Sequence, residues 1–304
     1  MRARAYLAKS AHALALLGAL TAAGLTPAMG GAGEQFAANG TSECADVLFV
    51  GVRGSGQGAE EFDGLGRQVA AVRDGLAQSL DGTGMTMRTH ALDYSAASFG
   101  DLLKPSNLFE PLYLDSISEG WASLSAYLDS QRACLDAGEK LVLAGYSQGA
   151  LIVHLAIANG WEYADSLVGA LLVADPFRDP GVRNIGSADP GTGLYDPAQA
   201  LAGMGFSIPG ADLRAIPAET ASVTFGLCNA FDVVCDFGDH FEEHLASFGA
   251  EGAGVHSAYE DEQLYQLGAV PARAILWGDE VATDADSRGS GLPDLSVGSR
   301  ARGR

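Results

Sequence analysis

Residues 141–150 of this 304-residue chain read LVLAGYSQGA, and they decide the fold. The apolar run up to Tyr146 is typical of a strand buried on both faces, and a helix is predicted directly after Ser147. A Gly-x-Ser-x-Gly pattern between a strand and a helix places the serine on a sharp turn, with its hydroxyl above the sheet. Gly145 and Gly149 lack a Cβ, so strand and helix can approach closely. The pattern predicts that Ser147 is a nucleophile; the alternative is an ordinary strand-to-helix turn.

Strands and helices alternate on both sides of this stretch. A nearly continuous apolar run predicts a strand at 46–52, and further strands are predicted at 85–94, 140–146, 167–174 and 223–227. Apolar residues at steps of three and four predict helices at 62–80, 117–134, 150–158 and, broken at Pro271, within 257–278. Residues 178–220 are rich in Gly, Pro and Asp and predict a long loop. This alternation predicts an α/β fold, a three-layer α/β/α sandwich with a central, mostly parallel sheet.

The two ends of the chain differ in composition from the middle. Arg2, Arg4 and Lys9 precede an apolar run of small residues and leucines, and residues 28–30 offer a small-x-small cleavage site. These features are typical of a secretory signal peptide over residues 1–30. A membrane anchor is the alternative, but the apolar run is shorter than the roughly 20 residues that span a bilayer. We therefore expect a secreted, extracellular protein without a stable membrane anchor.

The remaining chain divides by composition into three parts. We expect residues 31–43 to be a flexible lead-in, 44–278 to be one domain without an internal linker or repeat, and 279–304 to be a disordered tail. The 47% apolar and 18% charged residues support a buried core. The formal charge of -20 excludes nucleic acid and anionic lipid headgroups as favoured partners.

Four cysteines lie in the expected domain: Cys44, Cys134, Cys228 and Cys235. An even number of cysteines in an exported chain favours two disulfides, with free buried thiols as the alternative. Four cysteines allow three pairings, and spacing alone does not choose between them. The short separation of Cys228 and Cys235 suits a local loop.

A serine nucleophile needs a base, and the base needs an orienting acid. The chain order Ser, then Asp or Glu, then His leaves three downstream histidines as candidate bases: His240, His244 and His256. His154 follows Ser147 on the same predicted helix and points the wrong way, and His90 precedes the nucleophile. We interpret His154 as a packed or surface histidine and His90 as structural.

Three motifs of this chain resemble those of the cutinase family, in particular of its secreted actinobacterial members. The first is the turn 145–149, Gly-Tyr-Ser-Gln-Gly. The second is 228–235, Cys-Asn-Ala-Phe-Asp-Val-Val-Cys, and the third is the Arg-Gly-Ser turn at 53–55. Order and spacing agree from about residue 44 to 276, so the resemblance covers nearly all of the expected domain.

The resemblance implies an α/β-hydrolase with Ser147 as nucleophile, Asp232 as orienting acid and His256 as general base. His256 is followed three residues later by Tyr259, similar to the family's His-x-x-Tyr. A disulfide-closed loop would also hold Asp232 rigidly, as an orienting acid requires. Asp175, at a strand end, is the rival acid.

The resemblance further implies an oxyanion hole and a disulfide pairing. The backbone N–H groups of Ser55 and Gln148 would bind the oxyanion, assisted by the Ser55 hydroxyl; a plain Gly-Ser turn is the alternative for Ser55. The implied disulfides are Cys44–Cys134 and Cys228–Cys235.

The implied activity is hydrolysis of carboxylic esters through an acyl-enzyme, by a monomer that needs no metal and no organic cofactor. Cutin-like polyesters, lipids or short acyl esters are the expected substrates, and acetylated polysaccharide, as in acetylxylan-type deacetylation, is a competitor. The Gly-rich residues 56–58 and the loop 178–220 depart from the family and leave substrate preference open.

Two other classes of function are alternatives. Residues 240–244, His-Phe-Glu-Glu-His, fit a zinc-peptidase pattern, but a pattern this short arises by chance in acidic chains and a solvated helix face explains it. A non-catalytic surface protein on a hydrolase scaffold is disfavoured, because all three triad positions are filled.

Overall fold

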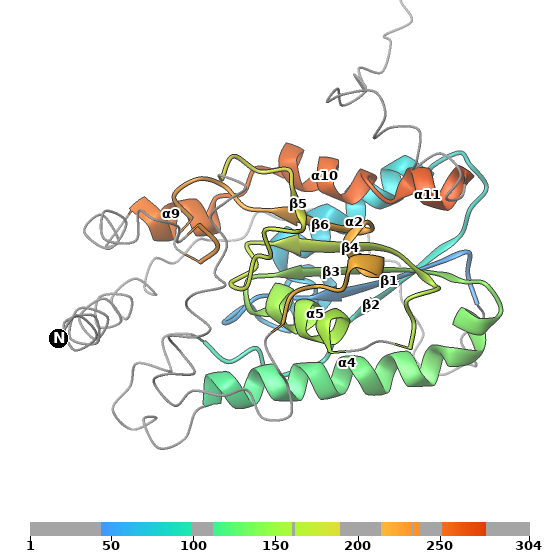
Figure 1. Cartoon of the computed structure of the whole chain (residues 1–304), viewed down its shortest axis with the longest axis horizontal. Helices are drawn as coiled ribbons and strands as arrows, with labels where there is room; N and C mark the ends of the chain where they lie inside the picture. Colours follow the sequence, from blue (N-terminus) through green and yellow to red (C-terminus); the bar gives the residue numbers. More distant parts are fainter. Residues whose placement is uncertain are drawn as a thin grey trace, which may run out of the picture.

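The computed structural model describes residues 44–98, 112–159, 162–188, 214–232, 234–236 and 251–277. The expected signal peptide, lead-in and C-terminal tail lie outside these ranges, as does the His240–His244 motif. Within the described part of the chain, helices cover both faces of a central sheet (Figure 1).

The sheet has six strands in the order β2-β1-β3-β4-β6-β5. Their bounds are β1 Val47–Val52, β2 Met87–Ala91, β3 Lys140–Tyr146, β4 Leu167–Val173, β5 Arg183–Asn184 and β6 Thr224–Leu227. Every pair of neighbours is parallel. The register pairs Val52 with Gly145 and Tyr146 with Val173, so these strands end at one edge. The segments that follow β1, β3 and β6 therefore meet there.

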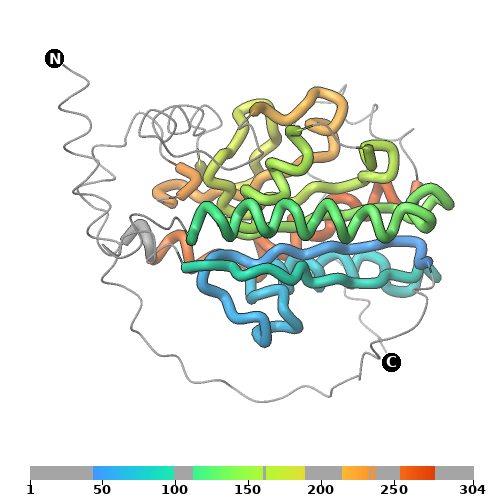
Figure 2. The backbone as a smooth tube through the Cα atoms, turned by 90° about the horizontal axis from the view of Figure 1, so that it is seen from below, coloured from blue at the N-terminus to red at the C-terminus, as the bar shows by residue number. Residues whose placement is uncertain are grey.

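The helices lie in two layers. Their bounds are η1 Glu61–Gly64, α2 Gly66–Leu80, α4 Leu112–Asp136, α5 Gln148–Ala158, α7 Ala218–Ala221, α9 Glu251–Ser257, α10 Asp261–Ala269 and α11 Ala272–Trp277. Figure 1 shows α2, α10 and α11 on one face of the sheet and α4 and α5 on the other. Figure 2 shows α4 running along the sheet, on the side away from α2. The expected three-layer arrangement is confirmed.

Strand β1 explains why both faces are covered. Successive side chains of a strand point to opposite faces. Leu48 and Val50 belong to the apolar cluster under α4 and α5, whereas Val47 and Phe49 belong to the cluster under α2 and α10. All four are fully buried. An uninterrupted apolar run is what a strand between two helical layers requires.

The first helix begins later than the apolar spacing predicted. Phe62 was expected in its buried stripe, but it lies in η1, is 55% exposed and has a φ of 52°. Gly64 and Gly66 also have positive φ. The left-handed backbone of this segment ends η1 and reorients the chain before α2, so the apolar stripe starts at Leu65 instead.

Three other elements differ from expectation. Strand β2 is shorter than the predicted 85–94, and α4 begins at Leu112, before the predicted 117. The predicted loop 178–220 contains the short strand β5 and the helix α7 in its described parts. Helix α9 was not predicted, because its Gly- and Ala-rich sequence has no apolar stripe.

Two disulfides close the described structure, and both have the pairing that the resemblance implied. Cys44–Cys134 joins the segment before β1 to the end of α4, with a Cα–Cα distance of 5.3 Å. Cys228–Cys235 closes the loop after β6, with a Cα–Cα distance of 6.0 Å. In the described residues, no helix is both long and apolar enough to cross a bilayer.

Candidate active site

Ser147 lies between the end of β3 and the start of α5, with φ 54° and ψ −118°. A non-glycine residue in such a conformation costs on the order of 1–3 kcal/mol and persists only where its surroundings enforce it. The flanking glycines provide the room. A Cβ on Gly145 would lie 2.4 Å from the Gly149 carbonyl oxygen, and one on Gly149 would lie 2.1 Å from that of Val52. Any larger residue at these positions would push α5 away from the sheet edge.

His256 meets Ser147 from α9. Its Nε2 lies 3.1 Å from the Ser147 Oγ. Its Nδ1 lies 3.0 Å from Asp232 Oδ1 and 3.1 Å from Oδ2. An ionised carboxylate can only accept, so Nδ1 carries the proton and Nε2 is left to accept the Ser147 hydroxyl proton. The structure therefore brings the three predicted triad residues into one hydrogen-bonded line.

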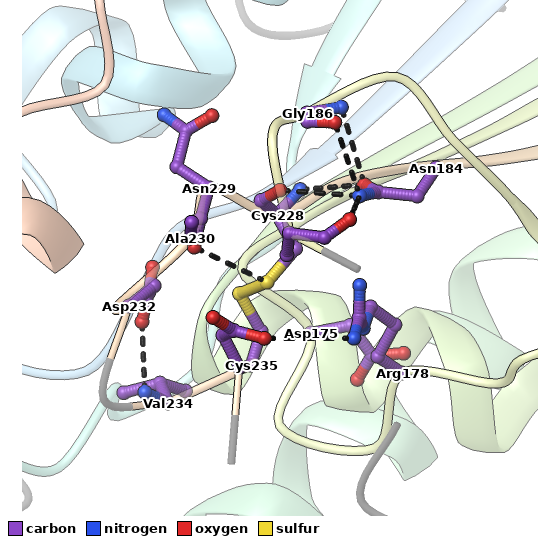
Figure 3. The surroundings of a disulfide bond; sticks show 12 residues. Asp175, Arg178, Asn184, Gly186, Cys228, Asn229, Ala230, Asp232, Val234 and Cys235 are labelled. Atoms are coloured by element: carbon purple, nitrogen blue, oxygen red, sulfur yellow. Dashed lines mark hydrogen bonds and ion pairs between the residues drawn. A yellow bond between two sulfur atoms is a disulfide. The ribbon is translucent and has the colours of Figure 1, made fainter. Parts of the chain in front are cut away.

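Asp232 is fully buried in the loop that Cys228–Cys235 closes. The Val234 N–H donates to its Oδ1 at 2.7 Å, a bond visible in Figure 3. Burial alone would raise the pKa of this carboxyl. The positive charge of His256 when it is protonated and its hydrogen bond, with further hydrogen bonds from Tyr259 and Val234, outweigh burial and hold the pKa of Asp232 below its ordinary value. Asp232 is therefore ionised and accepts the Nδ1 proton of the His256 imidazole.

Two tyrosines that sequence reasoning did not assign to the site complete it. Tyr146 stacks on the His256 ring at 5.1 Å between centroids and donates its hydroxyl to the His256 carbonyl at 2.8 Å. Tyr259 donates its hydroxyl to Asp232 Oδ2 at 2.6 Å. Burial raises the pKa of Tyr146, with a further contribution from the charge of Asp232, so its hydroxyl remains a donor. The only sequence signals were an aromatic residue before the serine and the His-x-x-Tyr spacing.

The predicted oxyanion donors lie at the same sheet edge. Ser55 is in the turn after β1, and Gln148 is the first residue of α5 and fully buried. Buried Arg53 shapes the turn: its NH1 donates to the Leu92 carbonyl at 3.0 Å and its Nε to the Gln57 carbonyl at 3.1 Å. The Gln57 Oε1 accepts a hydrogen bond from the backbone N–H of Gly54, the residue before Ser55, at 2.7 Å.

The rival acid is engaged elsewhere. Asp175 follows β4 and is buried, with its Oδ2 2.7 Å from His154 Nδ1. The other nitrogen of His154 lies 2.9 Å from the Arg214 carbonyl oxygen. Burial disfavours the imidazolium, but the charge and hydrogen bond of Asp175 outweigh it and raise the pKa of His154. Asp175 thus orients the buried His154, not His256.

His90 lies apart from the triad, on β2. His90 stacks on Tyr127 with ring centroids 3.5 Å apart, in keeping with a structural role. In the parts of the chain that the structure describes, no group of three or more His, Cys, Asp or Glu side chains could hold a metal ion. The zinc-peptidase pattern at 240–244 lies outside those parts.

Comparison with known proteins adds independent evidence. A family model described as Cutinase matches residues 43–262, a range that contains every residue of the site described above. Phospholipase Culp4 of Mycobacterium tuberculosis is 27% identical over 221 residues, which cover 73% of this chain and 77% of that protein. A carboxylesterase Culp6 homolog of Corynebacterium glutamicum is 32% identical over 165 residues, which cover 49% of this chain and 52% of the relative.

The solved structures to which the chain is similar are more distant in sequence. The catalytic core domain of acetyl xylan esterase from Trichoderma reesei is 21% identical, with a TM-score of 0.45 over 71% of this chain and 97% of that one. A cutinase-like protein from Cryptococcus sp. is 18% identical, with a TM-score of 0.48 over 78% of this chain and 98% of that one.

Proposed function

Because this chain belongs to the cutinase family and is a carboxylic ester hydrolase, we propose that Ser147, His256 and Asp232 carry out the ester hydrolysis as a nucleophile, a general base and an orienting acid. One observation carries the proposal: a hydrogen-bonded line runs from the Ser147 Oγ through both nitrogens of His256 to the Asp232 carboxylate. Each link is within hydrogen-bonding distance, and the link from the Ser147 Oγ to His256 Nε2 is the one across which the proton moves.

In the first half-reaction, the Ser147 oxygen attacks the ester carbonyl carbon while His256 Nε2 takes the hydroxyl proton. Asp232 stabilises the imidazolium that forms and keeps it in one orientation. The tetrahedral intermediate then collapses: the bond to the alcohol oxygen breaks, His256 returns the proton to that oxygen, and an acyl-enzyme remains.

In the second half-reaction, water attacks the acyl-enzyme carbonyl and His256 takes its proton. The bond to the Ser147 oxygen breaks, the proton returns to Ser147, and the carboxylic acid leaves. In both steps, negative charge develops on the carbonyl oxygen. We propose that the N–H groups of Ser55 and Gln148 receive it, the latter at the N-terminus of α5. Each such donor contributes about 3 kcal/mol to transition-state stabilisation.

For the substrate, we propose neutral carboxylic esters: lipids, short acyl esters or a cutin-like polyester. The formal charge of -20 disfavours polyanionic substrates. Phe231, directly before Asp232, is 63% exposed and offers an apolar side chain close to the site. The name of the Mycobacterium relative, a phospholipase, agrees with lipid esters. Deacetylation of acetylated polysaccharide is the competing use of the same chemistry.

We also propose that residues 1–30 are a signal peptide, and that 44–278 act outside the cell as one monomeric domain. The two disulfides support export, because such bonds persist in oxidising compartments.

The test of the proposed triad is Ser147→Ala, with Ser125→Ala as the matched control. Ser125 is exposed on α4, and its hydroxyl donates only to the backbone of the preceding turn at 3.0 Å. We expect Ser147→Ala to lower kcat on p-nitrophenyl butyrate by about 10⁴- to 10⁶-fold without loss of folding, and Ser125→Ala to leave it unchanged. A near-native rate for Ser147→Ala would overturn the assignment.

A series of p-nitrophenyl esters from acetyl to palmitoyl, run beside acetylated xylan, tests the substrate class. We expect kcat/KM to peak with an acyl chain longer than acetyl. If acetyl esters and acetylated xylan are the best substrates, the hypothesis of a polysaccharide deacetylase replaces the hypothesis of a lipid or polyester hydrolase.

A further inference from the structure

We propose that Tyr259 is a positioning residue of the ester hydrolase: its buried hydroxyl is the donor that fixes the Asp232 carboxylate against His256. This inference rests on the proposed function, because it assumes that Asp232 orients the base. It adds a residue that touches neither the substrate nor the reacting atoms.

The direction of the hydrogen bonds around the phenol is determined by its partners. The Tyr259 oxygen lies 2.6 Å from Asp232 Oδ2 and 3.3 Å from the backbone nitrogen of Asn229. The amide can only donate, so the phenol oxygen accepts from Asn229 and gives its single proton to Asp232. The sulfur of Cys235 lies 3.5 Å away, but it is in a disulfide and carries no proton. The result is a directed chain from the loop backbone through the phenol to the acid.

The carboxylate depends on this donor because it has few others. The Nδ1 proton of His256 is shared between the two oxygens at 3.0 and 3.1 Å. Oδ1 also accepts the Val234 N–H at 2.7 Å, and Oδ2 also accepts the Tyr259 hydroxyl. Asp232 is fully buried, so bulk water is not at hand to replace a lost donor. Without the phenol, the carboxylate would be held firmly at Oδ1 only and could rotate away from the imidazole.

Tyr259 is itself held on two sides. Its carbonyl oxygen accepts hydrogen bonds from Nη1 and Nη2 of Arg67, each at 3.1 Å, which ties Tyr259 to α2. Its ring is fully buried and lies edge-on to Tyr146, with 6.5 Å between centroids. Because Tyr259 follows His256 by three residues, one hydroxyl links the segment that carries the base to the loop that carries the acid.

The protonation of the phenol favours the same role. Burial, with the charge of Asp232, raises the pKa of Tyr259 well above its usual value. Among the residues that the structure describes, the ionisable groups that face the His256–Asp232 pair are Tyr259 itself, Tyr146 on β3 and, beyond them, Arg67 on α2. The phenol therefore stays a donor throughout the pH range in which esterases are assayed.

The first experiment compares Tyr259→Phe with Tyr163→Phe. Tyr163 is also buried and also donates its hydroxyl to a carboxylate, that of Asp129, but it lies before the amino end of β4, away from the site. We expect Tyr259→Phe to lower kcat by about 10- to 100-fold with little change in KM, which is the loss of one hydrogen bond to a buried charge. Tyr163→Phe should leave kcat unchanged.

The pH profile separates positioning from a purely structural role. Loss of the phenol donor favours adding a proton to the His256–Asp232 pair, and that proton inactivates the base. The acid limb of kcat/KM for Tyr259→Phe should move to higher pH by up to about one unit. If the variant changes only the melting temperature, and its kcat and acid limb match the wild type, the proposal is wrong.

A double-mutant cycle tests whether Tyr259 acts through Asp232. In an Asp232→Ala background, Tyr259→Phe should cost less than threefold, because the acceptor of the Tyr259 hydroxyl is already lost. Full additivity of the two losses would show that Tyr259 acts elsewhere and would overturn the proposal. An active Ser147→Ala variant would instead overturn the proposed function, so the two failures are distinguishable.

A second substitution covers the case in which Tyr259→Phe does not fold. Incorporating 3-fluorotyrosine at position 259 keeps the ring and the hydroxyl but makes the phenol a stronger donor. The acid limb should then move to lower pH, opposite to Tyr259→Phe. An unchanged profile would count against the proposal.

Discussion

Removing the two disulfides one at a time should separate stability from catalysis. Disulfide stabilisation by restriction of the unfolded chain grows with the logarithm of the loop that is closed. The bonds span 7 and 90 residues. The loop-entropy relation then gives about 2.4 kcal/mol for Cys228–Cys235 and about 4.6 kcal/mol for Cys44–Cys134. The long-range bond should therefore be the more important of the two for the free energy of unfolding.

Activity should follow the opposite order. The short loop carries Asp232, whereas Cys44–Cys134 joins the start of β1 to the end of α4, at the sheet edge opposite Ser147. We expect Cys228→Ala/Cys235→Ala to lower kcat at least tenfold under conditions in which it is folded. We expect Cys44→Ala/Cys134→Ala to keep kcat within about twofold.

The assay pairs urea unfolding, followed by circular dichroism, with hydrolysis of p-nitrophenyl butyrate at a temperature well below both transitions. We expect the larger loss of stability in Cys44→Ala/Cys134→Ala and the larger loss of kcat in Cys228→Ala/Cys235→Ala. If the Cys44→Ala/Cys134→Ala variant also loses more kcat, or both variants lose equal fractions, the loop does not hold the acid in the way argued here.

Two further predictions concern Gly145, in the turn that carries Ser147, and the buried His154. Gly145→Ala would bring a Cβ to 2.4 Å from the Gly149 carbonyl oxygen. We therefore expect the free energy of unfolding, measured by urea titration, to fall by about 2–4 kcal/mol, and kcat for ester hydrolysis to fall as well. A variant as stable as the wild type would contradict this. The raised pKa of His154 predicts a stabilisation that is complete below the ordinary value of 6.5 and is lost as the pH rises through the raised value. The difference in unfolding free energy between wild type and His154→Gln should therefore shrink from pH 5 toward pH 9, and a difference that grows would refute it.

The sequence predicted the core strands well, because a strand buried on both faces has a continuous apolar run that can be recognised without its neighbours. Strand β3 has the predicted bounds Lys140–Tyr146, since an apolar run buried on both faces ends where Ser147 must turn. Apolar spacing failed at Phe62, where the side chain has the right position for a stripe but the backbone is left-handed. The spacing of apolar residues indicates which side chains can share a face of a helix. It does not predict the backbone φ values that change the direction of the chain.

The site was less accessible to local reasoning, because its contacts are distant in the chain. The chain order left His240, His244 and His256 as equal candidates for the base, and only the family resemblance selected His256. The bond from Tyr146 to the His256 carbonyl spans 110 residues. The bond from Tyr259 to the acid spans 27 residues. Such partners become visible only when the sheet edge brings β3, the disulfide loop and α9 together.

The most direct test of the central claim is covalent labelling with a p-nitrophenyl alkylphosphonate, followed by peptide mass spectrometry. Attack by an activated serine on phosphorus displaces p-nitrophenolate and leaves a stable adduct. The account predicts one adduct per molecule, on the Ser147 oxygen, with activity lost in proportion to labelling and no adduct after Asp232→Asn or His256→Ala on the same timescale. An adduct on another residue that abolishes activity, or complete labelling of Ser147 with the esterase rate intact, would contradict it.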